Sequence, residues 1–338
     1  MSRYISYSLD QARRRAMHLA ARQHVSLGTD LTKHVDIFGV MKRQLWVMFQ
    51  PLGSLYGMYM SMGNAHGIVI NSKHPPHLQR FTAAHEYGHF LMEHGPSIDK
   101  EEQVLSSARY SNTQEVEAQT FAAHFLMPLQ LVNTLLHQMD LPLKPEKLSV
   151  RAIYQLSLEL GASYTAVINH LVSLKKLDPL AANEFRIKTP KAIKAGIRGG
   201  EGPLSRWADV WTLFNRDAGR EISIYPDDEI HIYLPETLAD DSPWRLPQTI
   251  DTNLITLVQS RLEITSSLAW IEQEQSYYVH HFTFRSLSPG SILLRLEKQG
   301  IRPEVYELYI NCLPRQTQGL LDAQKKLLPH YTVPEMDE

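Results

Sequence analysis

A His-Glu-x-x-His pattern at residues 85–89 restricts the possible folds of this chain more than any other feature of its sequence. Its two histidines can reach one point in space only if the segment is an α-helix, because residues four apart then share a face. Small and apolar residues at helical spacing supply a core-facing side: Phe81, Ala84, Gly88 and Leu91. We therefore predict a helix over residues 78–94 that directs both imidazoles toward one metal ion.

Glu86 gives this pattern a chemical use beyond metal binding. A zinc ion (Zn2+) with three protein ligands keeps one position open for water, whose pKa then falls toward about 7. From its place beside the histidines, Glu86 can take a proton from the water and pass it to a departing amine. We expect His85 and His89 to be metal ligands and Glu86 to be the catalytic base of peptide hydrolysis.

The third ligand has to come from another element, and Glu115 and Glu117 compete for that role. The predicted helix over residues 113–127 has an apolar stripe formed by Ala118, Phe121, Ala122, Phe125 and Leu126. Extending this stripe toward the start of the helix reaches Glu115 and not Glu117. An inward carboxylate needs a partner, and a metal ion supplies one. We predict Glu115 as the third ligand, with Glu117 as the alternative and His124 in a structural role.

Hydrophobic periodicity and turn residues predict the other elements of the N-terminal half. Helices are expected at residues 9–27, 35–40, 129–140, 147–160 and 164–175, and strands at residues 45–49, 56–61 and 66–71. The first helix contains an arginine run at residues 13–15. A solvated helix face explains that run better than a nucleic-acid site does.

The overall composition excludes some classes of protein. The chain has 338 residues, 43% apolar and 21% charged, which is typical of a globular protein of two or three domains. A net charge of −2 gives no general attraction to nucleic acid or membrane. Because Cys312 is the single cysteine, one chain forms no disulfide framework and no cysteine-rich zinc module. No apolar run is long enough for a signal peptide or a membrane span, so we expect a cytoplasmic protein.

The two helical motifs together resemble a known family. Residues 81–89, Phe-Thr-Ala-Ala-His-Glu-Tyr-Gly-His, and residues 115–128, which contain Glu-x-x-Ala-Gln-x-Phe-Ala-Ala-x-Phe-Leu-Met-Pro, are similar to the ImmA/IrrE family of metallopeptidases. The similarity covers roughly residues 10–175. It implies zinc held by two histidines and a glutamate, a catalytic motif glutamate, and cleavage of a specific cytoplasmic protein, usually a helix-turn-helix repressor. Gln119 departs from the asparagine usual in the family.

Residues 156–171 have the pattern of a helix-turn-helix, with Gly161 in the turn and Ser163 as the cap of the second helix. A helix that reads DNA bases should offer arginine, glutamine or asparagine near its start. This helix offers Tyr164 and Thr165 there, with Asn169 and His170 further along. We therefore favour a packing or repressor-docking role over DNA binding.

The C-terminal part changes character. Residues 179–206 combine basic residues and glycines with little apolar periodicity, which indicates a linker, or one short helix inside a linker. Strand patterns follow at residues 222–224, 229–234, 276–284, 291–296 and 305–310. This region is similar to the chagasin-like immunoglobulin fold, whose members inhibit cysteine proteases through three loops. Loops 240–244 and 300–304 lack that group's motifs, so we favour a protein-recognition module, with a sandwich that only stabilises the chain or its dimer as the alternative.

These observations predict a multidomain α+β chain. We expect a mainly helical, zincin-like metallopeptidase core with a small sheet at residues 1–140, a helix-turn-helix-like segment at 141–178, a linker at 179–206 and an immunoglobulin-like sandwich at 207–338. The favoured function is site-specific cleavage of a cytoplasmic helix-turn-helix repressor, which would switch on stress, mobile-element or phage-related genes. The alternative is a DNA- or partner-binding regulator whose metal site is structural or vestigial.

Overall fold

The computed structural model describes residues 2–63, 65–95, 97–100, 113–141, 148–202, 205, 207–236, 243–247, 250–264, 278–299 and 303–325. The chain divides into two compact units. The first comprises Met1–Thr134, Leu160–Ala166 and Gln316–Glu338, and the second comprises Leu135–Glu159 and Val167–Arg315. The predicted loop tips at residues 240–242 and 300–302 lie outside the described residues.

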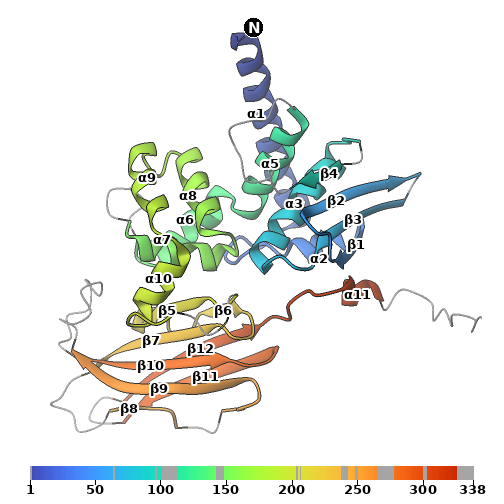
Figure 1. Ribbon diagram of the computed structural model, residues 1–338. Helices are drawn as coiled ribbons and strands as arrows, with labels where there is room; N and C mark the ends of the chain where they lie inside the picture. Colours follow the sequence, from blue (N-terminus) through green and yellow to red (C-terminus); the bar gives the residue numbers. More distant parts are fainter. Residues whose placement is uncertain are drawn as a thin grey trace, which may run out of the picture. The chain divides into compact units, whose positions relative to one another are not determined.

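The first unit combines helices with one small sheet (Figure 1). Its helices include α1 (Ser2–Leu27), α2 (Ile37–Met41), α3 (Pro76–Leu91), α5 (Thr113–Leu126), the start of α6 (Leu129–Gln138), and α11 (Asp322–Lys325). Its strands are β1 (Trp46–Gln50), β2 (Leu55–Met62), β3 (Ala65–Asn71), β4 (Ser97–Lys100) and β13 (Gly319–Leu320), in the order β13-β1-β3-β2-β4. Only β1 and β3 run parallel, because β2, β4 and β13 each pair antiparallel.

Helix α3 lies at the centre of this unit, buried against the sheet and against α5. Of the residues from Gln79 to His89, all except Phe81 are buried, so no side of the helix is fully solvated. Gly88 allows α5 to come close, because a Cβ atom there would lie 3.1 Å from Phe121 Cδ1 and 3.3 Å from the Ala118 Cα. The close approach places the first turn of α5 beside the histidines of α3.

The end of the described chain also belongs to the first unit. Strand β13 pairs with β1, and Leu321 donates from its backbone N–H to the Val47 carbonyl over 3.2 Å. The Gln324 side chain, 3% exposed, accepts a hydrogen bond from the Val47 N–H over 3.0 Å and donates to the Leu45 carbonyl. The C-terminal boundary therefore differs from the expected domain at 207–338, because residues 316–325 complete an edge of the first sheet.

The second unit contains two four-stranded sheets and a group of helices (Figure 1). Its helices are α7 (Val150–Leu160, whose last residue falls in the first unit), α8 (Tyr164–Ser173, whose first three residues fall in the first unit), α9 (Pro179–Ile187) and α10 (Pro190–Ile197) among the described residues. One sheet has the order β5-β7-β10-β9, with strands Val210–Phe214, Glu229–Glu236, Tyr278–Ser286 and Ile255–Ile264. The other has the order β6-β12-β11-β8, with strands Glu221–Ile224, Glu304–Cys312, Gly290–Lys298 and Trp244–Arg245.

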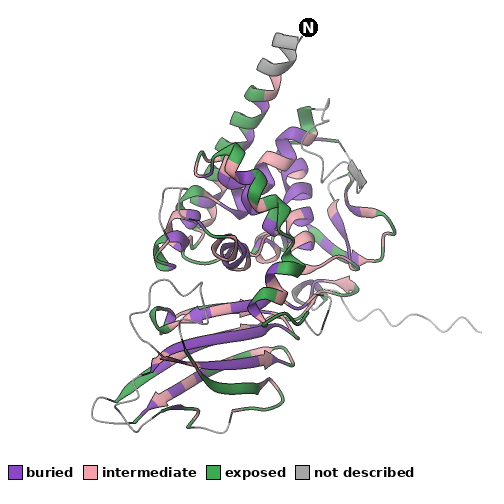
Figure 2. Ribbon diagram, turned by 60° about the vertical axis from the view of Figure 1, so that its left-hand side comes forward, coloured by how far each residue is buried: buried purple, intermediate pink, exposed green. Residues whose placement is uncertain are grey.

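Side chains from both sheets of this unit form one apolar core. Strand β7 contributes Ile230 and Ile232, β10 contributes Phe282 and Phe284, and the facing sheet contributes residues such as Tyr306. Strands β7 and β10 are buried along most of their length (Figure 2). Together the two units give the mixed α and β content that the sequence predicted.

The segment 179–206 contains two capped helices where the sequence indicated a linker. Asp178 accepts hydrogen bonds from the backbone N–H groups of Leu180 and Ala181, at 2.8 and 3.1 Å, and starts α9. Thr189 caps α10 in the same way through the Ala192 N–H. Each cap is followed by proline, and this pair is a helix start signal. The hydrophobic pattern did not reveal these two helices, because each is too short and has too few apolar residues to show clear periodicity.

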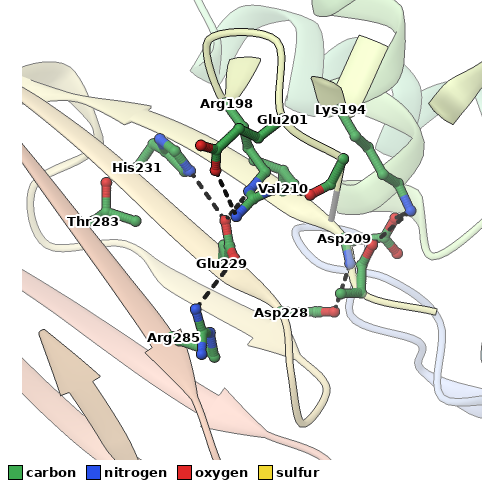
Figure 3. Close-up of polar contacts among 12 residues, drawn as sticks. Lys194, Arg198, Glu201, Asp209, Val210, Asp228, Glu229, His231, Thr283 and Arg285 are labelled. Carbon is green, nitrogen blue, oxygen red and sulfur yellow. Dashed lines mark hydrogen bonds and ion pairs between the residues drawn. The ribbon is translucent and has the colours of Figure 1, made fainter. Parts of the chain in front are cut away.

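The basic residues of that segment hold α10 on the sheet of the second unit (Figure 3). Lys194 Nζ lies 2.7 Å from Asp209 Oδ1, and Arg198 Nε lies 2.7 Å from Glu229 Oε2. Glu229 is 2% exposed and also lies 3.7 Å from Arg285 and 3.6 Å from His231, so Arg198 is the nearest of three partners of a buried carboxylate. Two of the basic residues in the expected linker, Lys194 and Arg198, therefore make structural contacts.

Helix α7 is joined to the same sheet through backbone groups of its edge strand. The Tyr154 hydroxyl accepts a hydrogen bond from the Val210 N–H over 3.1 Å, and Gln155 Oε1 accepts one from the Thr212 N–H over 3.1 Å. Glu159 pairs with Arg220 over 2.9 Å. These contacts protect the edge strand β5 and make α7 an integral part of the second unit.

We predict that Gly88→Val lowers the free energy of unfolding by about 1–3 kcal/mol, because the added side chain overpacks the contact between α3 and α5. Denaturant unfolding followed by circular dichroism measures this loss. Gly95→Val serves as the control, since a Cβ at Gly95 meets nothing within 4 Å. Equal stability of the two variants would contradict the close approach of the helices.

Candidate metal centre

Two histidines of α3 face each other at the centre of the candidate site. His85 and His89 lie one helical turn apart, and their Nε2 atoms are 3.2 Å from each other. Each residue is 1% exposed. Two buried imidazole nitrogens at this separation need a proton or a cation between them.

Glu115 completes the group from the first turn of α5. Its Oε2 atom lies 3.3 Å from His85 Nε2, and its Oε1 atom lies 3.5 Å from His89 Nε2. Within the described residues, these three form the group of histidine, cysteine and acidic side chains with the spacing of a metal site. Burial alone would raise the pKa of Glu115, but hydrogen bonds and charge interactions with both histidines outweigh it and hold the pKa well below its usual range. The site therefore offers two nitrogens and an ionised carboxylate.

Glu117, the alternative ligand, is directed elsewhere. It is 6% exposed, and its Oε2 atom lies 3.0 Å from His94 Nε2. Its Oε1 atom accepts a hydrogen bond from Arg15 NH1 over 3.2 Å. Residues two positions apart in an α-helix differ by about 200° around the axis, so Glu115 and Glu117 cannot face the same point. The structure brings Glu115 to the histidines and Glu117 to a different pair of groups.

Glu86 is fully buried between α3 and the neighbouring strand β2. A Cβ atom at Gly57 of β2 would lie 3.5 Å from Glu86 Oε1, 2.5 Å from Thr82 Cγ2 and 2.9 Å from the Val69 carbonyl oxygen. Glycine at position 57 therefore lets the strand pass close to the carboxylate. The shape of the sheet, and not only the motif, determines the surroundings of Glu86.

Two other residues of α5 named from the sequence lie outside the triad. His124 is half-buried, and burial lowers its pKa. Gln119, at the position where the ImmA/IrrE family usually has asparagine, is also half-buried. Neither residue belongs to the metal-binding group that the structure forms.

His94 is a residue of the site that the sequence pattern did not reveal. It follows the end of α3, where Glu93 adopts φ of 56° and turns the chain back, so that the His94 N–H donates to the His89 carbonyl over 3.0 Å. The same turn brings His94 Nδ1 to 3.0 Å from His89 Nδ1. Helical spacing cannot place this residue, because it lies beyond the helix. The helix expected over residues 78–94 ends at Leu91 in the structure, and the only signal in the sequence was a further histidine five positions after His89.

Two histidines, a carboxylate and an adjacent buried glutamate define a candidate metallopeptidase site. Residues 40–171 match the family model of the IrrE N-terminal-like domain, Peptidase_M78. The match includes the triad and Glu86, and it supports the resemblance of this part of the chain to the ImmA/IrrE metallopeptidases.

Other comparisons add little. A sequence comparison with curated proteins finds no match. Among solved structures, the chain is similar to the cysteine protease inhibitor EhICP2 from Entamoeba histolytica, with 13% identity over 32% of this chain and 100% of that one, and a TM-score of 0.27. It is also similar to amebosin, with 12% identity over 31% of this chain and 98% of that one, and a TM-score of 0.23. Scores this low establish no shared fold.

We predict that Glu115→Ala reduces bound zinc from one ion per chain toward none, because it removes one of the three donors. Glu117→Gln should still bind one ion per chain, since Glu117 donates no atom to the triad. Metal analysis after dialysis against zinc measures both variants. The opposite result, zinc lost only with Glu117→Gln, would show that Glu117 and not Glu115 is the ligand.

Proposed function

We propose that this chain is a zinc-dependent endopeptidase of the ImmA/IrrE type, with His85, His89 and Glu115 as zinc ligands and Glu86 as the catalytic base. The observation that supports this most directly is the convergence of the three donors beside a buried glutamate on the same helix. A purely structural metal site has no use for a base in that position.

The donor set and its dimensions support zinc. Two histidines and a glutamate are a ligand set of catalytic zinc sites, which keep a fourth position open. Ligand atoms about 2.0–2.2 Å from a tetrahedral zinc ion lie roughly 3.3–3.6 Å from one another. The distances of 3.3 Å from His85 Nε2 to Glu115 Oε2 and 3.5 Å from His89 Nε2 to Glu115 Oε1 lie in this range, and the 3.2 Å between the two Nε2 atoms is just below it.

The proposed mechanism assigns one task to each residue. His85, His89 and Glu115 bind the metal, and Glu115 supplies a negative charge that helps retain a divalent cation. Zinc, when bound, polarises the peptide carbonyl and makes water a stronger acid. Glu86 accepts the proton of the attacking water and passes it to the departing amine. Burial of Glu86 beside β2 restricts the orientation of its carboxylate, which lowers the entropic cost of reaching the reactive geometry.

The proposed substrate is a cytoplasmic helix-turn-helix repressor, whose cleavage would switch on stress, mobile-element or phage-related genes. This part of the proposal rests on the resemblance to the ImmA/IrrE family and on the match to the IrrE N-terminal-like domain. In this proposal, the sandwich of the second unit selects the substrate protein. Within the part of the chain that the structure describes, no helix has the length and apolar character needed to cross a membrane.

The alternative function is a DNA- or partner-binding regulator whose metal site is structural or vestigial, and the DNA-binding form of it finds less support in the described residues of α8. Tyr164 and His170 are only 4% exposed. The Asn169 side chain accepts a hydrogen bond from Arg186 NH2 over 2.7 Å. Three of the side chains that could have read base edges are therefore occupied by packing or hydrogen bonding, which favours a structural role for this segment.

We predict that Glu86→Gln lowers the rate of repressor cleavage by about 10²–10⁴-fold while one zinc ion per chain stays bound, because the variant loses the base but not the ligands. A helix-turn-helix repressor encoded beside this protein is the substrate to test, and gel analysis of its fragments measures the rate. Glu184→Gln, an exposed change on α9, is the control.

Removal of zinc provides the second test of this function. A chelator should stop cleavage, and added zinc should restore it, because no other described group of residues offers the same metal site. Cleavage that survives both the chelator and Glu86→Gln would exclude the proposed mechanism. Zinc binding without cleavage of any such repressor would favour the structural alternative.

A further inference from the structure

A chain of buried polar groups extends from His89 away from the candidate metal site. His89 Nδ1, the ring nitrogen that does not face Glu115, lies 3.0 Å from His94 Nδ1. His94 Nε2 lies 3.0 Å from Glu117 Oε2, and Glu117 Oε1 lies 3.2 Å from Arg15 NH1. His89, His94 and Glu117 are 1%, 7% and 6% exposed, so only the arginine at the end of the chain reaches solvent.

Metal binding determines the direction of every hydrogen bond in this chain, a step that rests on the proposed function. A neutral imidazole that binds a metal through Nε2 keeps its proton on Nδ1. His89 Nδ1–H then donates to His94 Nδ1, which leaves the His94 proton on Nε2. His94 Nε2–H donates to Glu117 Oε2, and Arg15 donates to the second oxygen of the same carboxylate. Each donor faces an acceptor, and no second arrangement satisfies all the groups.

Glu117 is the residue whose burial needs this explanation. An isolated buried carboxylate is costly, yet Glu117 lies inside the unit with a histidine on one oxygen and an arginine on the other. Partners behind a metal-binding histidine hold its ring in one orientation and make it a stronger ligand. The pairing with Arg15 comes from α1, so three separate segments contribute to the support of one ligand.

We propose that His94 and Glu117 are positioning residues for the metal ligand His89, with Arg15 balancing the charge of Glu117. His94 sets the tautomer and the ring orientation of His89, and Glu117 does the same for His94. The two glutamates of α5 then have distinct tasks, since Glu115 contacts the metal and Glu117 acts through two histidines.

The test is the zinc dissociation constant of the full-length protein, measured by competition with a chelating dye. His94→Phe keeps the volume of the ring but removes both nitrogens, and should weaken zinc binding by about 10–100-fold. Glu117→Leu should weaken it by a similar factor. Glu117→Gln keeps an oxygen that can accept from His94 and should weaken it less than Glu117→Leu does.

A control variant separates positioning from general loss of packing. His24 is a buried histidine of the same unit that stacks on Phe125, with ring centroids 4.6 Å apart and outside the polar chain. His24→Gln should leave the zinc dissociation constant unchanged within twofold. The absorption spectrum of the Co2+-loaded protein gives a second measure, because a misoriented His89 should change the ligand-field bands in His94→Phe but not in His24→Gln.

The outcomes distinguish this proposal from the proposed function. If the unaltered protein binds no zinc, both are wrong. If it binds zinc and His85→Ala abolishes binding, while His94→Phe and both Glu117 variants bind as tightly as the unaltered protein, only the positioning role is wrong. If Glu117→Gln and Glu117→Leu weaken zinc binding equally, loss of the hydrogen bond that Glu117 accepts from His94 is not the cause of the weaker binding, and the proposal is also overturned. A graded loss with an altered Co2+ spectrum supports it.

Discussion

The close packing of α3 against α5 is the contact on which the candidate metal centre depends. The pattern at residues 85–89 supplies two histidines, but two ligands on one helix do not make a catalytic site. Gly88 and Ala118 remove the side-chain bulk that would hold the helices apart, and the first turn of α5 then brings Glu115 to both imidazoles. The distance between the helices thus controls whether the third ligand is present.

Buried charge is the main physical problem that this site has to solve. Glu86, Glu115 and Glu117 are all largely removed from solvent within a small volume around α3 and α5. Glu115 is stabilised by the two ligand histidines, and Glu117 by His94 and Arg15. Glu115 and Glu117 therefore have separate sets of partners. This division explains how two glutamates only two positions apart can both be buried and still act differently.

The second unit follows the same principle with different elements. Arg198 compensates the buried Glu229, and Tyr154 and Gln155 satisfy backbone groups of the edge strand β5. These polar contacts attach α7 and α10 to a sheet whose other face belongs to the apolar core. The segment described from the sequence as a linker belongs to the same unit as the sandwich strands, whereas the helix-turn-helix segment is divided between the two units.

Local patterns in the sequence were sufficient for the motif helix, most strands and the preference for Glu115, because helical and strand periodicity depend on neighbouring residues alone. They were insufficient for His94, for the partners of Glu117, for α9 and α10, and for the pairing of β13 with β1. These features arise from contacts between segments far apart in the chain, or from helices too short to show a period. The sequence by itself determined which residues can bind a metal and act on water. Tertiary structure decided which glutamate joins the two histidines and which groups support them, because only packing brings a buried charge to its partner.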